Sequence, residues 1–140
     1  MMKRHARIAI MHPEKGILVV AKKGHAFNLT GGAAEQYEAL KSAAVRERRE
    51  EIGRAVRTTG LVFHSDHLIK KPAKKKGGKI VPEFHRVFTA RLKPGAQPRP
   101  GDEVNWAKWV NSKNFGKTPL AAPADMVVPM LLGIGRRKRK

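Results

Sequence analysis

Three glutamates stand close together in one short stretch of a strongly basic chain. Glu47, Glu50 and Glu51 are three and four residues apart, so on a helix of about 3.6 residues per turn their carboxylates project from one face. Like charges at this spacing repel one another. Mg²⁺ prefers carboxylate oxygens and substrate phosphates as ligands and keeps several waters. The pattern therefore suggests a metal site that holds a phosphate-bearing substrate.

A glycine pair precedes these glutamates. Gly31 and Gly32 lack side chains, so the backbone there can approach a metal or a phosphate closely. The alternative is a solvated helix in which the glutamates pair with Arg46, Arg48 and Arg49 of the same segment. Helix geometry alone does not decide between these two interpretations.

The elements that must position these residues alternate between strand and helix. β-branched runs at 6–11 and 16–23 flank a turn and predict a hairpin. Residues 38–52 contain no Pro or Gly and predict a helix that ends at Gly53. Further strands are expected over 59–69, 80–92 and 104–110, and a short helix over 123–135. Strands mixed with helices in one small domain predict an α/β fold, with helices packed on the faces of a sheet.

Length and charge restrict the class of protein. At 140 residues and 41% hydrophobic composition, the chain is expected to form one domain over 1–134, followed by a basic tail at 135–140. Thirty Lys and Arg against eleven Asp and Glu give a net charge of +19. This charge favours anionic partners, such as nucleotides, RNA, DNA or an acidic membrane surface.

The features that the sequence lacks are compatible with a reducing compartment and do not establish one. Cysteine is absent, so a disulfide framework and thiolate chemistry are excluded. The first residues, MMKRHARIAIMHPEKG, lack a small-residue cleavage site and are interpreted as a strand rather than a signal peptide. No apolar run is long enough to span a bilayer. We expect a cytoplasmic protein with no membrane partner.

The order of residues from Gly32 to Gly53 resembles the signature of the Nudix hydrolases, Gly-x5-Glu-x7-Arg-Glu-U-x-Glu-Glu-x-Gly-U, where U is bulky and apolar. The matching residues are Gly32, Glu38, Arg46, Glu47, Glu50, Glu51 and Gly53. The lead-in FNLTGG and the later segment DEVNWAKWV are also similar to parts of that family. The resemblance implies a Nudix fold, an α/β/α sandwich with a mixed β-sheet and a loop-helix-loop metal site.

The resemblance also implies roles for the matched residues. Glu47, Glu50 and Glu51 would bind Mg²⁺ or Mn²⁺, and Gly32 would offer its backbone carbonyl. Those three glutamates and Arg46 are the implied catalytic residues. Arg46 would orient a glutamate by a charge-assisted hydrogen bond, and Glu38 would support the start of the helix behind the metal ligands. The implied reaction is hydrolysis of a pyrophosphate bond, with metal ions activating a bound water.

Three positions depart from the family pattern. The apolar U positions hold Arg48 and Arg54, and Tyr37 stands where glycine is common. On a helical wheel, Arg48 lies among apolar residues on the face that should meet the sheet. Its charge must therefore reach solvent or a polar partner, because an unpaired buried guanidinium is costly.

Residues outside the box supply further candidates. Glu103 follows a Pro- and Gly-rich loop and is the candidate for an additional catalytic carboxylate, with Glu83 as its competitor. Lys74 and Lys75 lie in the lysine run 70–79 and are candidates for substrate binding, although such a run is at least as typical of a solvated loop.

Histidines and tryptophans give weaker signals. His64, His67 and His85 lack the spacing of zinc fingers or zincins and are interpreted as ordinary strand histidines. Trp106 and Trp109 are an odd number of residues apart, so they should face opposite sides of a strand. One is expected in the core and the other is available to stack on a base.

The function most consistent with these residues is a Mg²⁺-dependent pyrophosphohydrolase acting on a nucleoside diphosphate linked to another moiety. Two alternatives remain open: a basic Nudix-fold module that binds RNA or a ribonucleoprotein with little catalysis, and an enzyme acting on the 5′ end of RNA. The oligomeric state is also open, with a homodimer as one candidate.

Overall fold

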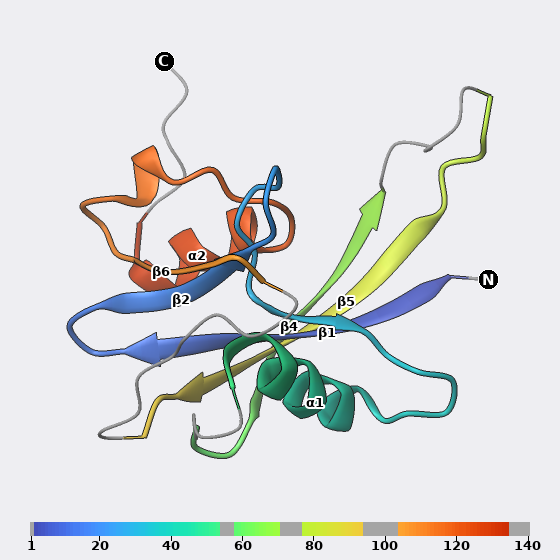
Figure 1. Ribbon diagram of the computed structural model, residues 1–140, viewed down its shortest axis with the longest axis horizontal. Coiled ribbons are helices and arrows are strands. Elements are labelled where there is room, and N and C mark those ends of the chain that lie inside the picture. The colour runs from blue at the N-terminus through green and yellow to red at the C-terminus, as the bar shows by residue number, and fades with distance from the viewer. Residues whose placement is uncertain (1, 54–57, 71–76, 94–103, 135–140) are drawn as a thin grey trace.

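The computed structural model describes residues 2–53, 58–70, 77–93 and 104–134. Within them the chain forms a mixed sheet and two α-helices (Figure 1). The elements are β1 (Lys3–His12), β2 (Gly16–Ala21), β3 (Thr30–Ala33), α1 (Leu40–Ile52), β4 (Val62–Lys70), β5 (Pro82–Arg91), β6 (Trp106–Val110), a 3-10 turn (Phe115–Lys117) and α2 (Ala124–Leu132). Neither of these helices is long and apolar enough to cross a membrane. The expected tail at 135–140 lies outside the described residues.

Strand β1 is the centre of the sheet, whose order is β4-β5-β1-β2-β6 with β3 also paired to β1. One edge of β1 pairs with β5 in parallel along nearly its whole length. The opposite edge is divided between two antiparallel partners. Strand β3 pairs with His5 to Ile8, and β2 pairs with Met11 and His12. The sheet therefore splits between β2 and β3.

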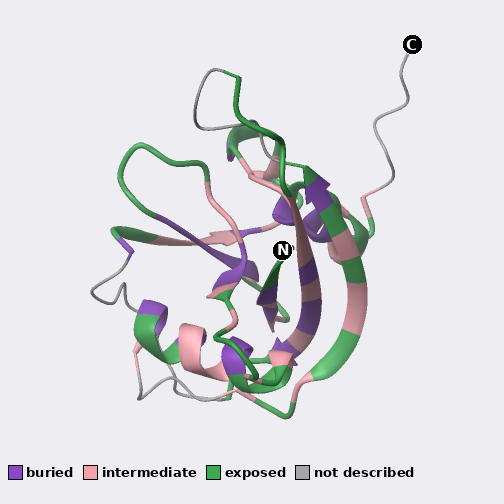
Figure 2. Ribbon diagram, turned by 90° about the vertical axis from the view of Figure 1, so that its right-hand side faces the viewer, coloured by how far each residue is buried: buried purple, intermediate pink, exposed green. Residues whose placement is uncertain are grey.

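Two apolar clusters hold the helices on opposite faces of this sheet. Ala6, Ile8 and Ile10 of β1 pack in one cluster with Ala43, Ala44 and Ile52 of α1. Ala9 of β1 belongs to the other cluster, which contains Ala124, Val127 and Val128 of α2. This period of two is the ordinary alternation of side chains along a strand. Because both faces are covered, buried residues follow one another along most of β1 and β2, and Figure 2 marks buried stretches in strands and helices alike. The expected sandwich of helices around a mixed sheet is confirmed.

The predicted elements agree with the structure except at their ends. The hairpin is present, with Met11 opposite Ile17. Helix α1 begins two residues later than predicted, so Glu38 lies in the preceding turn. The helix ends as predicted at Gly53, whose φ of 97° favours glycine and whose N–H donates to the Arg49 carbonyl.

The two tryptophans lie on opposite sides of β6, as predicted. Trp109 is partly buried and packs against the α1-side cluster. Trp106 keeps 48% of its surface exposed.

Arg48 is buried on the sheet-facing side of α1, as the helical wheel predicted. Its Nη1 donates to the Thr58 hydroxyl at 2.9 Å. Its Nε is buried and has no hydrogen-bond partner among the described residues. Burial, followed by the nearby charge of Arg49, lowers the pKa of Arg48. The second arginine of the departing pair, Arg54, lies outside the described residues.

Replacing Arg48 by leucine should leave the stability of the protein unchanged or raise it by up to about 2 kcal/mol. The substitution removes a buried charge that has an unsatisfied nitrogen, and it supplies an apolar side chain to the core. It also removes the hydrogen bond to the neutral Thr58 hydroxyl, which is a smaller loss. Urea denaturation measures the change. The exposed neighbour Arg49→Leu is the control and should shift stability by no more than about 0.5 kcal/mol. A loss above about 1 kcal/mol for Arg48→Leu would contradict this account of the helix face.

Candidate functional site

The helix α1 and the glycine strand β3 are joined by a buried carboxylate. Glu51 is 7% exposed, and its Oε1 accepts a hydrogen bond from the Gly31 N–H at 2.6 Å. Gly31 has a φ of 145°, and a Cβ there would lie 2.0 Å from the Ala6 carbonyl oxygen of β1. Only glycine permits this approach between the two strands. Strand β3 therefore brings a backbone donor directly to the helix carboxylate.

The other two glutamates of the box lie at different depths. Glu47 is partly buried, and its carboxylate lies so close to Gly32 that a Cβ on Gly32 would come within 2.7 Å of the Glu47 carboxyl carbon. Glu50 is more exposed, with 40% of its side chain accessible. The three carboxylates thus run from the buried Glu51 to the exposed Glu50 along one side of α1.

Arg46 connects these carboxylates to the turn that precedes the helix. Its Nε and Nη2 donate to the two oxygens of Glu38 at 3.0 and 2.9 Å. Its Nη1 donates to Glu47 at 3.0 Å and to Glu50 at 3.5 Å, and its Nη2 also donates to the Ala33 carbonyl. A bidentate arginine of this kind fixes the geometry as well as the charge of its partners.

The pKa values of this pair follow from the same bonds. The hydrogen bond from Arg46, together with the Glu35 N–H, lowers the pKa of Glu38 to about 2. The hydrogen bond to Glu38 in turn raises the pKa of Arg46. Both groups are therefore ionised throughout the physiological range, and Arg46 offsets part of the repulsion among the glutamates.

A cleft of about 430 Å³ opens where the sheet splits. Its walls come from the ends of β1 and β2, the glycine strand β3 and helix α1. Glu47 and Glu51 supply its acidic wall. Basic side chains lie on the same cleft: His5, Arg7, Lys22 and His25. The described part of the cleft therefore places carboxylates and cations side by side, an arrangement suited to a metal-bound anion.

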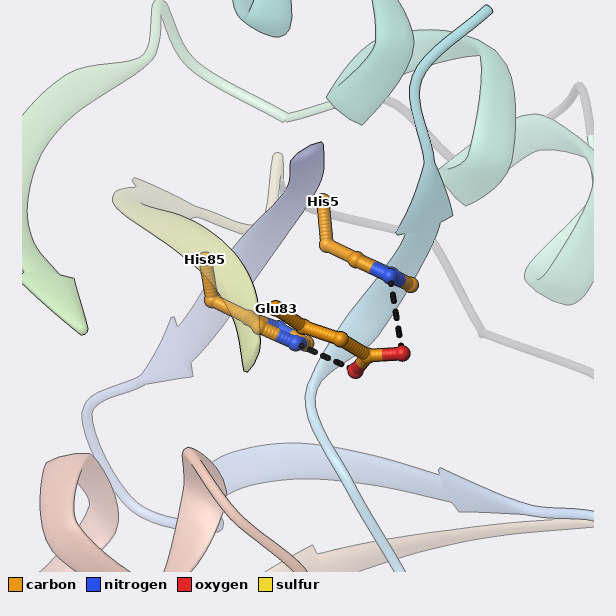
Figure 3. A group of neighbouring side chains, drawn as sticks. All are labelled: His5, Glu83 and His85. Atoms are coloured by element: carbon orange, nitrogen blue, oxygen red, sulfur yellow. Dashed lines mark hydrogen bonds and ion pairs between the residues drawn. The ribbon is translucent and has the colours of Figure 1, made fainter. Parts of the chain in front are cut away.

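A histidine cluster on β1 and β5 (Figure 3) reaches this cleft through His5. His5 and His85 are opposite each other in the parallel register, and their rings stack with centroids 4.4 Å apart. Glu83 lies between them, with one oxygen 3.1 Å from His85 Nε2 and the other 3.4 Å from His5 Nε2. These three residues have the donor types of a metal site.

Sequence reasoning missed this cluster. The sequence predicts an ordinary strand histidine at His85, like His64 and His67, but the contacts of His85 are with His5 and Glu83. His64 and His67 instead contact the Ser65 hydroxyl. The spacing of Glu83 and His85 places both on one side of a strand, which is the one signal that could have indicated the cluster.

Glu103, Lys74 and Lys75 lie outside the described residues. Glu83, the competitor of Glu103, lies in the histidine cluster rather than among the carboxylates of α1.

The fold and the site together define an α/β sandwich in which a glutamate-rich helix packs beside the glycine strand β3. The family model for the NUDIX domain matches residues 2–131, so the chain belongs to the Nudix family. A comparison with curated protein sequences finds no match.

Solved structures of several Nudix proteins share this fold. A protein from Chromobacterium violaceum assigned to the nudix hydrolase family is 23% identical, with a TM-score of 0.70 over 99% of this chain and 82% of the other. The dihydroneopterin triphosphate pyrophosphohydrolase of E. coli is 13% identical, with a TM-score of 0.74 over 96% and 99% of the two chains. An ADP-ribose pyrophosphatase from Streptococcus suis is 19% identical, with a TM-score of 0.61 over 99% and 96%. At these identities the likeness concerns the fold.

The burial of His85 predicts a specific dependence of stability on pH. Burial, followed by the charge of Arg7, lowers the pKa of His85 from 6.5 to about 4. In the unfolded chain His85 takes up a proton near its ordinary pKa of 6.5, whereas in the folded chain it stays neutral down to about pH 4. The free energy of unfolding is therefore unaffected by His85 above pH 6.5 and decreases as the pH falls from 6.5 toward 4. Urea denaturation across that window should show a steeper loss of stability for the wild type than for His85→Gln.

The exposed residue His25 provides the control for this prediction. His25→Gln should retain the wild-type dependence on pH. Identical dependence in the wild type and in His85→Gln would show that His85 does not resist protonation in the folded state.

Proposed function

We propose that this chain is a Mg²⁺- or Mn²⁺-dependent pyrophosphohydrolase that cleaves a nucleoside diphosphate linked to another moiety. The observation that supports it best is the placement of Glu47 and Glu51 on a cleft beside the glycine strand β3. Arg46 donates a hydrogen bond to Glu47 there. The donors are all oxygens, which suits these ions.

The contact between Gly32 and Glu47 tests whether a metal ion fits here. A side chain at Gly32 would occupy the space that the Glu47 carboxylate now uses. The missing side chain of Gly32 therefore leaves room for the Glu47 carboxylate, and the Gly32 backbone lies close to that carboxylate. The residues present fit a hard divalent ion, which would be held by Glu47, Glu50, Glu51 and the Gly32 carbonyl.

Each residue of the box has a proposed task. Glu38 fixes Arg46 through two hydrogen bonds, and Arg46 orients Glu47 and Glu50. Glu51 holds the turn through the Gly31 N–H. Metal ions, when bound, neutralise the diphosphate and lower the pKa of a bound water. Glu103 remains the proposed additional catalytic carboxylate, and Lys74 and Lys75 remain proposed substrate contacts.

The RNA-binding alternative has less support. It depends on the net charge of +19 and on the lysine run 70–79, most of which lies outside the described residues. Phosphate or nucleotide release should be measured with a panel of nucleoside diphosphate derivatives and with triphosphate-ended RNA, each with Mg²⁺ and with Mn²⁺. No release from any member of the panel with either ion would contradict the proposed function.

Glu50→Gln should lower hydrolysis by about 10²-fold or more while the fold persists. Glu50 is the most exposed of the three carboxylates, so its replacement disturbs few packing contacts. The loss of its charge also relieves repulsion between carboxylates on the helix. Added Mg²⁺ should raise the melting temperature of the wild type more than that of the variant.

Glu35→Gln is the matched control for this substitution, because Glu35 is exposed in the adjoining turn and lies outside the proposed ligand set. It should behave as the wild type in both measurements. Full activity in Glu50→Gln, together with an unchanged Mg²⁺ effect, would remove the metal from this helix and leave the solvated-face interpretation.

Gly32→Ala should lower hydrolysis by about 10²-fold with little loss of stability. The added methyl group meets the end of the flexible Glu47 side chain, which can turn away without disturbing the backbone. The comparison is with Gly60→Ala, where a Cβ has no neighbour within 4 Å. Activity and melting temperature measured on both variants separate a displaced ligand from a damaged fold, and wild-type activity in Gly32→Ala would contradict the proposed cradle.

A further inference from the structure

Arg7 is a cation of the cleft that the family signature does not include. It lies on β1, on the wall that also carries His5, and it is partly buried. Its Nη1 donates to the carbonyl oxygens of Leu29 and Gly31, at 3.1 and 3.3 Å. Its Nε faces His85 Nδ1 at 3.4 Å. The guanidinium is therefore fixed from two sides before any ligand arrives.

The contact with His85 determines which ring nitrogen carries the proton. Arginine can only donate, so His85 Nδ1 accepts and the proton lies on Nε2. That Nε2–H donates to Glu83 Oε1 at 3.1 Å, and the other Glu83 oxygen lies 3.4 Å from His5 Nε2 (Figure 3). The chain of contacts thus runs from the carboxylate of Glu83 through a neutral His85 to Arg7.

The same contacts disfavour a metal ion on the histidine cluster. A metal on His85 Nε2 would require the proton to move to Nδ1, where it would face a guanidinium that can only donate. The positive charge of Arg7 would also repel the ion. The cluster is better suited to holding an arginine than to holding a cation.

One side of the Arg7 guanidinium remains available. Its Nη2 donates no hydrogen bond to the part of the chain that the structure describes. Burial lowers the pKa of Arg7, and the carboxylates that oppose this effect are those of Glu51, Glu83 and Glu47. These carboxylates act on Arg7 through their charge, whereas the Nη2 donor is left for an acceptor that enters the cleft.

We propose that Arg7 forms a phosphate-binding subsite of the cleft, held in position by His85 and Glu83, and that it binds an oxygen of the substrate diphosphate. The identity of the substrate rests on the proposed function, whereas the preference for a phosphate rests on the Arg7 geometry. A fixed guanidinium loses little freedom on binding and matches phosphate geometry better than lysine does.

Calorimetric titration with inorganic pyrophosphate at a fixed Mg²⁺ concentration tests the subsite without any turnover. Arg7→Met should weaken binding by about 10- to 100-fold, the loss expected for one charge-assisted hydrogen bond. Arg7→Lys should recover part of this loss. His85→Gln should weaken binding less than Arg7→Met, because the guanidinium stays but is held less firmly. Arg86→Met is the matched control, since Arg86 pairs with Asp66 outside the cleft lining, and it should bind as the wild type does.

A second measurement separates phosphate binding from a merely structural role. Arg7 also donates hydrogen bonds to the carbonyl oxygens of Leu29 and Gly31, at the start of β3. The rise in melting temperature caused by Mg²⁺ alone should therefore be measured for the wild type, Arg7→Met and Arg7→Lys. An unchanged rise supports the subsite. Its loss in both variants would show that Arg7 acts only by positioning the turn, and would overturn the proposal.

The remaining outcomes are equally decisive. Pyrophosphate affinity that is absent in the wild type, or unchanged in Arg7→Met and Arg7→Lys, would overturn the subsite. Zn²⁺ binding that is lost in His85→Gln but kept in Glu50→Gln would assign the cluster to a metal and would also overturn it. Arg7-dependent pyrophosphate binding in a protein that hydrolyses none of the nucleotide panel would support the subsite while removing the proposed function.

Discussion

The hydrogen bond from the Gly31 N–H to Glu51 is the interaction on which the arrangement of the site depends. Glu51 is buried on α1, and Gly31 belongs to a strand that is itself paired with β1. The bond therefore ties the helix to the centre of the sheet through a charged group. Because a buried carboxylate is costly without donors, a displaced Gly31 would disturb both the helix position and the cleft.

The crowding of acidic residues in a basic chain becomes understandable from the partners that they have. Arg46 neutralises the outer side of the group through Glu38, Glu47 and Glu50. On the inner side, the Gly31 N–H donates a hydrogen bond to the buried Glu51. These contacts let the chain fold with its carboxylates already in position, so the proposed metal ions would meet a preorganised set of ligands rather than create one.

Much of this could be predicted from local sequence. The helix end at Gly53 and the burial of Arg48 lie within one short segment, where spacing determines geometry. The neighbourhood of Gly32 and Glu47 agrees with what the resemblance to the Nudix signature implies. The histidine cluster could not be predicted in this way. It depends on the parallel register that places His5 opposite His85, and residues about 80 positions apart carry no local signal of that register. Thr58, the hydrogen-bond partner of Arg48, could not be predicted for a related reason: it lies beyond the end of the helix, where helical spacing no longer applies.

The two sides of the cleft differ in how their charges are stabilised. On the α1 side, Glu47 is held by Arg46 of the same helix and Glu51 by the Gly31 N–H of β3, and Glu50 extends toward solvent. On the β1 side, Arg7 donates to carbonyl oxygens and to a neutral histidine, while the carboxylates of Glu51, Glu83 and Glu47 offset part of its desolvation through their charge. An anion that reached metal ions on the first side would find a fixed cation on the second. Opposite charges arranged across a partly desolvated cleft favour a ligand that carries its negative charge on two adjacent groups, and a diphosphate is such a ligand.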